Sequence, residues 1–162
     1  MLGLGETRLS IYLNDHLAGA TVAVNIARRS AASNRDTPLG AALDELAREI
    51  DEDRSALITV MDRLSVGRDP LKLALAWGAE RAGRLKLNGS LVGYSPLSRL
   101  EELEALLAGV NGKLALWETL QRTHGYDTRL TDVDLDALLE RARSQRRRLH
   151  RQHEKSAGQA FA

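Results

Sequence analysis

The sequence predicts an all-α protein folded as an antiparallel up-down four-helix bundle with an additional C-terminal helix. Apolar residues between Thr37 and Leu64 recur in alternating steps of four and three, which places them along one face of a long helix. A helix N-cap residue precedes each of the three prolines, which is a typical helix start. The pairs are Thr37-Pro38, Asp69-Pro70 and Ser95-Pro96. No stretch shows the period-two alternation of a strand.

The composition limits the classes of protein that the chain can belong to. Its 162 residues suit one domain, and we expect residues 1–154 to form it and residues 155–162 to be a frayed tail. The absence of cysteine excludes disulfides, thiolate metal sites and cysteine nucleophiles. A formal net charge of +1 provides no global attraction to nucleic acid or acidic membranes. With neither a signal peptide pattern nor an apolar run of roughly 18 residues, we expect a cytoplasmic protein without a membrane partner.

The first predicted helix begins at Thr7 or Ser10 and ends near Ala32. Its main face consists of small and large apolar residues at helical spacing. They are Leu9, Leu13, Leu17, Ala20, Val24, Ala27 and Ala31. Tyr12 and Ile26 extend the apolar character to a second face. A helix that is apolar around much of its circumference is expected to pack on two sides.

The second predicted helix covers residues 38–66 and carries the strongest apolar pattern in the chain. The residues of this pattern are Leu39, Leu43, Leu46, Ile50, Leu57, Val60 and Leu64. Asp53 occupies the position of the same register between Ile50 and Leu57. We therefore expect one carboxylate on or beside the apolar face, and Gly67 as the left-handed C-cap.

Three further helices are predicted over residues 70–87, 96–124 and 132–153. The first two begin at proline and end beside glycine, and the last begins with acidic residues that suit the positive end of a helix dipole. Short connections make the first four helices antiparallel neighbours. We expect the fifth helix to dock across the bundle or to extend from it, on its own subunit or on a second copy.

A candidate metal site combines Asp15, His16, Glu49, Asp53 and Glu80. Carboxylate oxygens and an imidazole nitrogen form the mixed shell that iron, manganese or zinc accepts, and we expect no other cofactor. The structural alternative is a half-buried His16 whose ring nitrogens are bound by a carboxylate or a carbonyl, with the acidic residues on a solvated helix face. A buried polar pair of this kind could also fix the helix register without any chemistry.

A candidate anion site lies at the N-terminus of the predicted helix 96–124. Arg84, Lys86 and Arg99 surround its free N–H groups, which could hold an anion together with these basic side chains. The alternative for these residues is an ordinary surface stabilised by ion pairs, in which Glu80 and Arg84 form a favourable pair one helical turn apart.

The predicted C-terminal helix is strongly basic and could bind a phosphate backbone. Between Glu140 and Lys155 the net charge is +5. The candidate nucleic-acid-binding residues are Arg143, Arg146, Arg147, Arg148 and Arg151. Basic residues near a helix C-terminus also complement the helix dipole, and this stretch lacks the aromatic residues on which bases stack. An oligomer contact or a solvated surface are therefore the alternatives.

A bundle of four long helices with carboxylates and a histidine at interior positions resembles the ferritin-like superfamily, whose members often bind two irons between the helices. The resemblance implies this architecture over residues 8–124. The ligand pattern of those proteins requires Glu-x-x-His on two helices, and none of the four histidines here has a glutamate three residues before it. The resemblance therefore does not imply di-iron chemistry. Residues 12–19 and 88–104 are also similar to small uncharacterised actinobacterial proteins of this type, which would make the source bacterial.

We therefore expect a non-enzymatic helical bundle that acts through protein–protein contact or self-association, with a homodimer as its assembly. This expectation rests on the lack of a catalytic constellation and on the apolar residues that the first and fourth predicted helices carry on more than one face. The alternatives are a metal-binding ferritin-like protein with a degenerate carboxylate and histidine site, and a protein that binds nucleic acid non-specifically through its C-terminal helix.

Overall fold

The computed structural model describes residues 4–75, 78 and 94–162, and every regular element in these ranges is helical. The elements are α1 (Leu4–Ser33), α2 (Pro38–Arg63), α4 (Pro96–His124), the short 3₁₀ helix η1 (Thr128–Leu130) and α5 (Leu135–Ala160). Residues 70–75 add a short helical segment. The predicted all-α class is therefore confirmed for the part of the chain that the structure describes.

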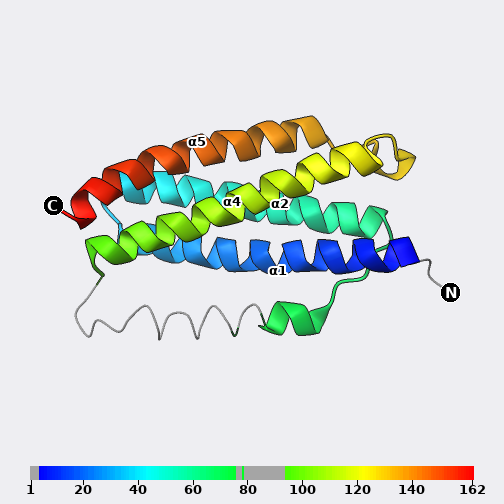
Figure 1. Cartoon of the computed structure of the whole chain (residues 1–162), viewed down its shortest axis with the longest axis horizontal. Helices are drawn as coiled ribbons and strands as arrows, with labels where there is room; N and C mark the ends of the chain where they lie inside the picture. The colour runs from blue at the N-terminus through cyan, green and yellow to red at the C-terminus, as the bar shows by residue number, and fades with distance from the viewer. Residues whose placement is uncertain (1–3, 76–77, 79–93) are drawn as a thin grey trace.

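Four long helices lie side by side along a common axis (Figure 1). α1 packs against α2, and α4 packs against α5; α1 also contacts α4, and α2 contacts α5. α2 ends at one end of the molecule and α4 begins at the other, so the two helices run in the same direction (Figure 1). The end of α2 and the start of α4 therefore lie at opposite ends of the bundle (Figure 1).

The C-terminal helix has a different place from the predicted one. α5 is one of the four packed helices and is not an addition to them, because Leu138, Leu139 and Leu149 are buried in the core. The described beginning of the predicted third helix lies outside this group, and the side chains of Leu71 and Leu75 are 67% and 64% exposed. The apolar face of α5 is narrow and lies between arginines, so its sequence pattern is weaker than that of α2.

The helix starts follow the predicted N-caps. The side chains of Thr37 and Ser95 each accept a hydrogen bond from a backbone N–H in the first turn of the helix that follows. Asp134 caps α5 in the same way, so this helix begins later than expected. At the end of α2, Ser65 and not Gly67 adopts the left-handed conformation, with φ 57°.

α5 also continues further than the sequence predicted. It ends at Ala160, so most of the expected tail 155–162 is helical. Ser156 is buried within this part of the helix. Because Gln159 also accepts a hydrogen bond from Arg99 at 3.0 Å, the last turns of α5 are attached to the start of α4.

The buried apolar residues form two clusters along the bundle. One contains Leu13, Leu57 and Trp117, together with residues of α5 and η1. The other contains Ile50 and Val110, together with residues of α1 and α5. The two clusters occupy successive stretches of α1, α2 and α4, and their junction is the place where the core becomes polar.

The tight turn between α1 and α2 generates the first prediction. An added Cβ at Gly40 would lie 2.1 Å from the backbone oxygen of Asn34, which cannot move away without opening the turn. We expect Gly40→Ala to lower the free energy of unfolding by about 2–3 kcal/mol, measured by urea denaturation. Gly112→Ala is the matched control, because a Cβ there meets nothing within 4 Å and alanine favours the helix. Equal effects of the two substitutions would contradict this explanation.

Candidate functional site

Asp53 is the buried charge around which the polar part of the core is built, and its side chain is only 2% exposed. Its Oδ2 atom accepts hydrogen bonds from Lys113 Nζ at 2.5 Å and from Gln145 Nε2 at 3.0 Å. Its Oδ1 atom accepts from Arg141 Nε at 2.7 Å, and Arg141 also donates to Glu52 at 3.1 Å. The expected burial of Asp53 is confirmed, and its partners come from α4 and α5.

Gln145 extends these contacts toward the surface of the bundle. Gln145 is fully buried. Its Oε1 accepts a hydrogen bond from Lys113, and its Nε2 donates one to Glu49 Oε2 at 3.0 Å. Glu49 in turn pairs with Arg148. We call the resulting set the polar network. It consists of Gln145, three carboxylates and three cations, namely Asp53, Glu49, Glu52, Lys113, Arg141 and Arg148.

The polar network links α2, α4 and α5 through buried charges that compensate one another. Burial lowers the pKa of Lys113 because desolvation disfavours its ammonium group, and the charge of Asp53 opposes that effect. Removing one partner of a buried pair leaves the other charge uncompensated. We interpret the polar network as a device that fixes how the three helices align, since each donor must meet an acceptor on another helix.

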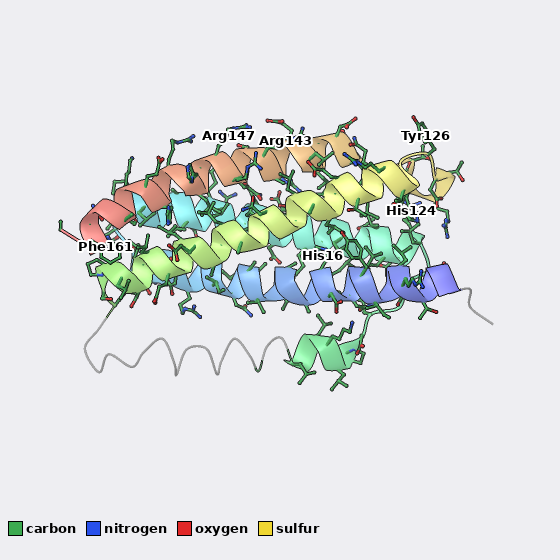
Figure 2. The ribbon with its side chains drawn as sticks, viewed as in Figure 1. His16, His124, Tyr126, Arg143, Arg147 and Phe161 are labelled. Carbon is green, nitrogen blue, oxygen red and sulfur yellow. The ribbon has the colours of Figure 1, made fainter. Side chains whose placement is uncertain are left out.

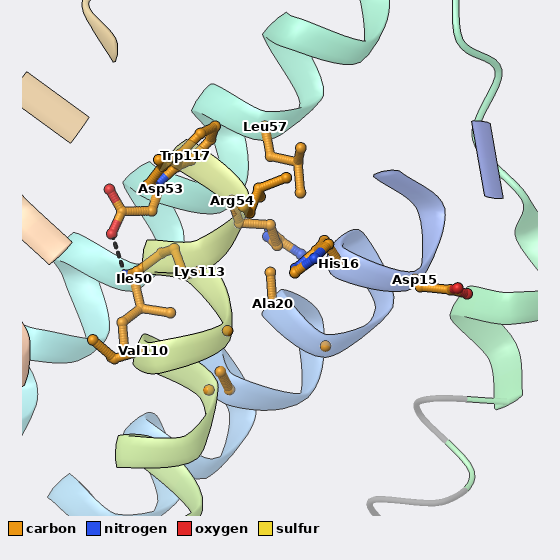
Figure 3. A pocket seen from close by; sticks show the side chains of 15 residues that line it. Asp15, His16, Ala20, Ile50, Asp53, Arg54, Leu57, Val110, Lys113 and Trp117 are labelled. Carbon is orange, nitrogen blue, oxygen red and sulfur yellow. Dashed lines mark hydrogen bonds and ion pairs between the residues drawn. The ribbon is translucent and has the colours of Figure 1, made fainter. Parts of the chain in front are cut away.

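A cavity of about 170 Å³ lies beside the polar network, between α1, α2 and α4 (Figure 3). Its apolar walls include Ile50 and Val110 from one core cluster and Leu57 and Leu116 from the other. The cavity therefore occupies the junction between the two clusters, where neither fills the space between the helices.

Polar side chains from three helices also line the cavity: His16 from α1, Asp53 and Arg54 from α2, and Lys113 and Trp117 from α4 (Figure 3). Burial lowers the pKa of His16, and the nearby charge of Asp15 opposes this more weakly. The indole Nε1–H of Trp117 is buried without a hydrogen-bond partner, and so is the Nε–H of Arg54. The cavity thus combines an apolar interior with a few polar groups.

Small residues keep the cavity open on the side where α1 faces α4. Gly19 and Ala20 of α1 and Gly109 and Gly112 of α4 all line it. An added Cβ would meet no atom within 4 Å at Gly19 or Gly112. Gly19 and Gly109 are also exposed, so the cavity reaches the surface between these two helices.

The residues of the predicted metal site are only partly brought together. Asp15, His16 and Asp53 line the cavity, whereas Glu49 binds α5 within the polar network. Glu80 lies outside the described residues. In the ranges that the structure describes, no group of three or more histidine and carboxylate side chains is arranged to hold a metal ion. The geometry therefore gives the metal hypothesis no support, and Asp53 already has its oxygens occupied by cations and an amide.

The predicted anion site cannot be assembled from the described residues, because Arg84 and Lys86 lie outside them. Arg99 is described, and its guanidinium donates to Gln159 at the end of α5. Its cation also lies 6.0 Å from the centre of the Tyr94 ring. Arg99 therefore has a structural role in joining the ends of α4 and α5.

The basic residues of α5 divide between the core and the surface. Arg148 belongs to the polar network, whereas Arg143 and Arg147 lie on the outer side of the helix (Figure 2). Arg146 and Arg151 are exposed. Binding of nucleic acid through this surface stays a prediction, from which Arg148 is now removed because its charge is used within the protein.

Sequence reasoning missed Lys113, Gln145, Arg141 and Trp117 as parts of the site. A signal for Gln145 does exist, since it stands in the apolar register of α5 between Ala142 and Leu149, as Asp53 does in α2. Trp117 could be assigned to the core from its spacing, but its unpartnered N–H depends on neighbours that the spacing does not reveal.

Comparisons of the chain with protein-family models, with curated proteins and with solved structures find no match. Among the described residues, no helix has the length and apolar character needed to cross a membrane. An assignment of function must therefore begin from the cavity and the polar network.

The second prediction concerns the buried ion pair. Asp53→Leu leaves the Lys113 ammonium buried without its carboxylate, so we expect a loss of about 3–5 kcal/mol in the free energy of unfolding. Adding Lys113→Met removes the uncompensated charge and should recover most of this loss. Chemical denaturation of the two single variants and the double variant measures the coupling. Additive effects would contradict a direct interaction between the two side chains.

The third prediction follows from the lowered pKa of His16. The unfolded chain binds a proton near pH 6.5 and the folded chain only at lower pH, so the free energy of unfolding should decrease as the pH falls through this window. In His16→Gln the decrease between pH 7 and pH 5 should be smaller, measured by urea denaturation at several pH values. His150→Gln controls for the loss of an exposed imidazole. An unchanged pH dependence in His16→Gln would show that His16 is not the group that titrates.

Proposed function

We propose that the protein is a non-enzymatic helical bundle of ferritin-like shape that binds a small molecule in the cavity between α1, α2 and α4. The observation that carries the proposal is that one cavity combines apolar walls from both core clusters with the unpartnered N–H groups of Trp117 and Arg54. Ligand sites in proteins typically have this composition, with mostly apolar lining and a small number of placed polar groups.

The order of the helices supports the ferritin-like shape. In such bundles one long connection crosses the molecule, and functional sites lie in the core between facing helices. Here the end of α2 and the start of α4 lie at opposite ends of the bundle (Figure 1). The cavity lies between facing helices, at the position where a bundle protein of this shape would hold its ligand.

The size of the cavity restricts the ligand. An apolar cavity of about 150 Å³ in a protein core can hold benzene, and this one measures about 170 Å³. A molecule built on one six-membered ring therefore fits, whereas a nucleotide or a dinucleotide cofactor does not. The opening between Gly19 and Gly109 gives such a molecule a path from solvent.

The ionisable groups beside the cavity favour binding over turnover. Lys113 and Asp53 are bound to each other and to Gln145, so the amine is held as a hydrogen-bond donor and the carboxylate as an acceptor. A nucleophile or a general base must be free to take up or release a proton at the substrate. Neither Lys113 nor Asp53 meets this requirement, which supports the expectation of a non-enzymatic protein.

Self-association is a separate proposal that concerns the outer surface. The large apolar side chains exposed in the described ranges include Ile11 on α1, Leu97 on α4, Tyr126 after α4 and Phe161 after α5. Tyr126 and Phe161 are at opposite ends of the molecule (Figure 2). Because these residues do not form one patch, the cavity is the better supported site.

The fourth prediction tests whether the cavity takes up an apolar ring. Toluene at about ten times its dissociation constant should raise the melting temperature by about 3–6 °C, because it binds only the folded chain. Gly112→Leu should abolish this rise, since its side chain would occupy the open space at Gly112. Differential scanning calorimetry with and without toluene measures both effects.

Gly158→Leu is the matched control for this test. It makes the same substitution in a helix at a glycine whose added Cβ also meets nothing within 4 Å, but on α5 and away from the cavity. This variant should keep the full response to toluene. If toluene changed neither the melting temperature nor the NMR spectrum of the native protein, the proposed function would be wrong.

A further inference from the structure

We infer that the cavity selects compact ring-sized molecules that carry a carbonyl-type oxygen, which would accept hydrogen bonds from Trp117 and Arg54. This inference rests on the proposed function and specifies the chemistry of the ligand. It follows from the unpartnered N–H groups of two residues that line the cavity, Trp117 and Arg54.

Trp117 provides the first donor. The residue is 1% exposed and lines the cavity, and its Nε1–H has no hydrogen-bond partner. An indole N–H can only donate, so it needs an acceptor. Buried polar groups almost always have a partner, because an unmade hydrogen bond costs the full loss of hydration. A ligand oxygen would supply the missing acceptor.

Arg54 provides the second donor from a different helix. Its Nε–H is buried without a partner, while its NH2 group pairs with Asp51 at 2.9 Å. The pairing with Asp51 holds the guanidinium and leaves the Nε–H unused. Residues of α2 and α4 that each carry an unpartnered donor therefore line the same cavity, which favours one ligand group that can accept from two directions. A carbonyl oxygen has two lone pairs and meets this requirement.

Asp53 is the buried carboxylate beside the cavity, and its acceptor oxygens are already occupied. Both oxygens of Asp53 accept hydrogen bonds from Lys113, Gln145 and Arg141. A ligand whose polar group only donates would therefore find no free oxygen on Asp53. The unpartnered N–H groups of Trp117 and Arg54 distinguish this cavity from an apolar void, and they favour a ligand with a hydrogen-bond acceptor as well as an apolar body.

The charges around the cavity favour a neutral oxygen over an anionic one. The formal charges of Asp15 and Asp53 cancel those of Arg54 and Lys113 among the lining residues. Without a net positive charge, the cavity does not compensate the desolvation of a carboxylate, which is larger than that of a ketone. Acetophenone carries a neutral carbonyl group on a phenyl ring and benzoate carries a carboxylate on the same ring. A comparison of their affinities therefore distinguishes a neutral oxygen acceptor from an anionic one.

The test compares acetophenone with α-methylstyrene, a molecule of similar size in which a CH₂ group replaces the oxygen. Titration calorimetry measures both affinities for the native protein and for Trp117→Phe, which keeps an aromatic ring and removes the N–H. We expect the ratio of the acetophenone affinity to the α-methylstyrene affinity to fall about three- to tenfold in Trp117→Phe. Because the same ratio is compared between the native protein and the variant, the difference in hydration between the two probes cancels.

Arg54→Met is a second variant that keeps the length of the stem and removes the other donor. It should lower the same ratio by a similar factor. Arg151→Met is its control, because Arg151 is exposed on α5 and does not line the cavity. If benzoate bound more tightly than acetophenone and lost affinity in Trp117→Phe, the oxygen acceptor would be supported and its source would be a carboxylate.

The outcomes separate this inference from the proposed function. If α-methylstyrene bound to the native protein but the ratio stayed the same in both variants, the selection for an oxygen acceptor would be wrong and the cavity would still bind ligands. If none of the probes bound, the proposed function itself would be overturned.

Discussion

The contact between Asp53 and Lys113 constrains the rest of the core. Two opposite charges lie among leucines, and burying them is favourable only if each finds further hydrogen-bond partners. Gln145 supplies one donor and one acceptor to the pair, and Arg141 supplies a second cation to Asp53. Lys113 lies on α4, and Gln145 and Arg141 lie on α5, so a shift of any of the three helices along its axis would leave a buried charge unmatched. The alignment of α2, α4 and α5 is therefore fixed by electrostatics as well as by apolar packing.

The cavity follows from the helix that does not take part in this contact. α1 supplies no side chain to the polar network, and where it faces α4 it carries Gly19 and Ala20 instead of large residues. The surface of α4 that faces α1 also carries glycine, at Gly109 and Gly112. α2, α4 and α5 are held in place by charge. The side chains of α1 at this level are too small to fill the space that remains between the helices. The geometry thus produces an opening beside the polar network rather than a continuous apolar core.

Helix-level features could be predicted from the sequence, because they depend on neighbours within one helix. The starts of α2 and α4 follow from Thr37 and Ser95, and the burial of Asp53 follows from its register. The partners of Asp53 could not be predicted, because spacing along a helix does not say which helices face each other. The sequence pattern predicts an external position for α5, because the arginines of this helix outnumber its buried leucines. The unpartnered N–H of Trp117 could not be predicted either, because it depends on neighbours from other helices that the pattern of one helix does not reveal.

The polar network and the cavity also impose different demands on the same helices. Apolar residues in place of a buried ion network often leave a protein equally or more stable, so the network contributes alignment more than stability. Alignment matters here because the cavity opens only where the glycines of α1 and α4 lie at the same level. A slip of α4 by one turn would move Lys113 away from Asp53 and would bring larger side chains opposite Gly19. The charges that hold α4 in register therefore also keep the entrance of the cavity lined by its smallest residues.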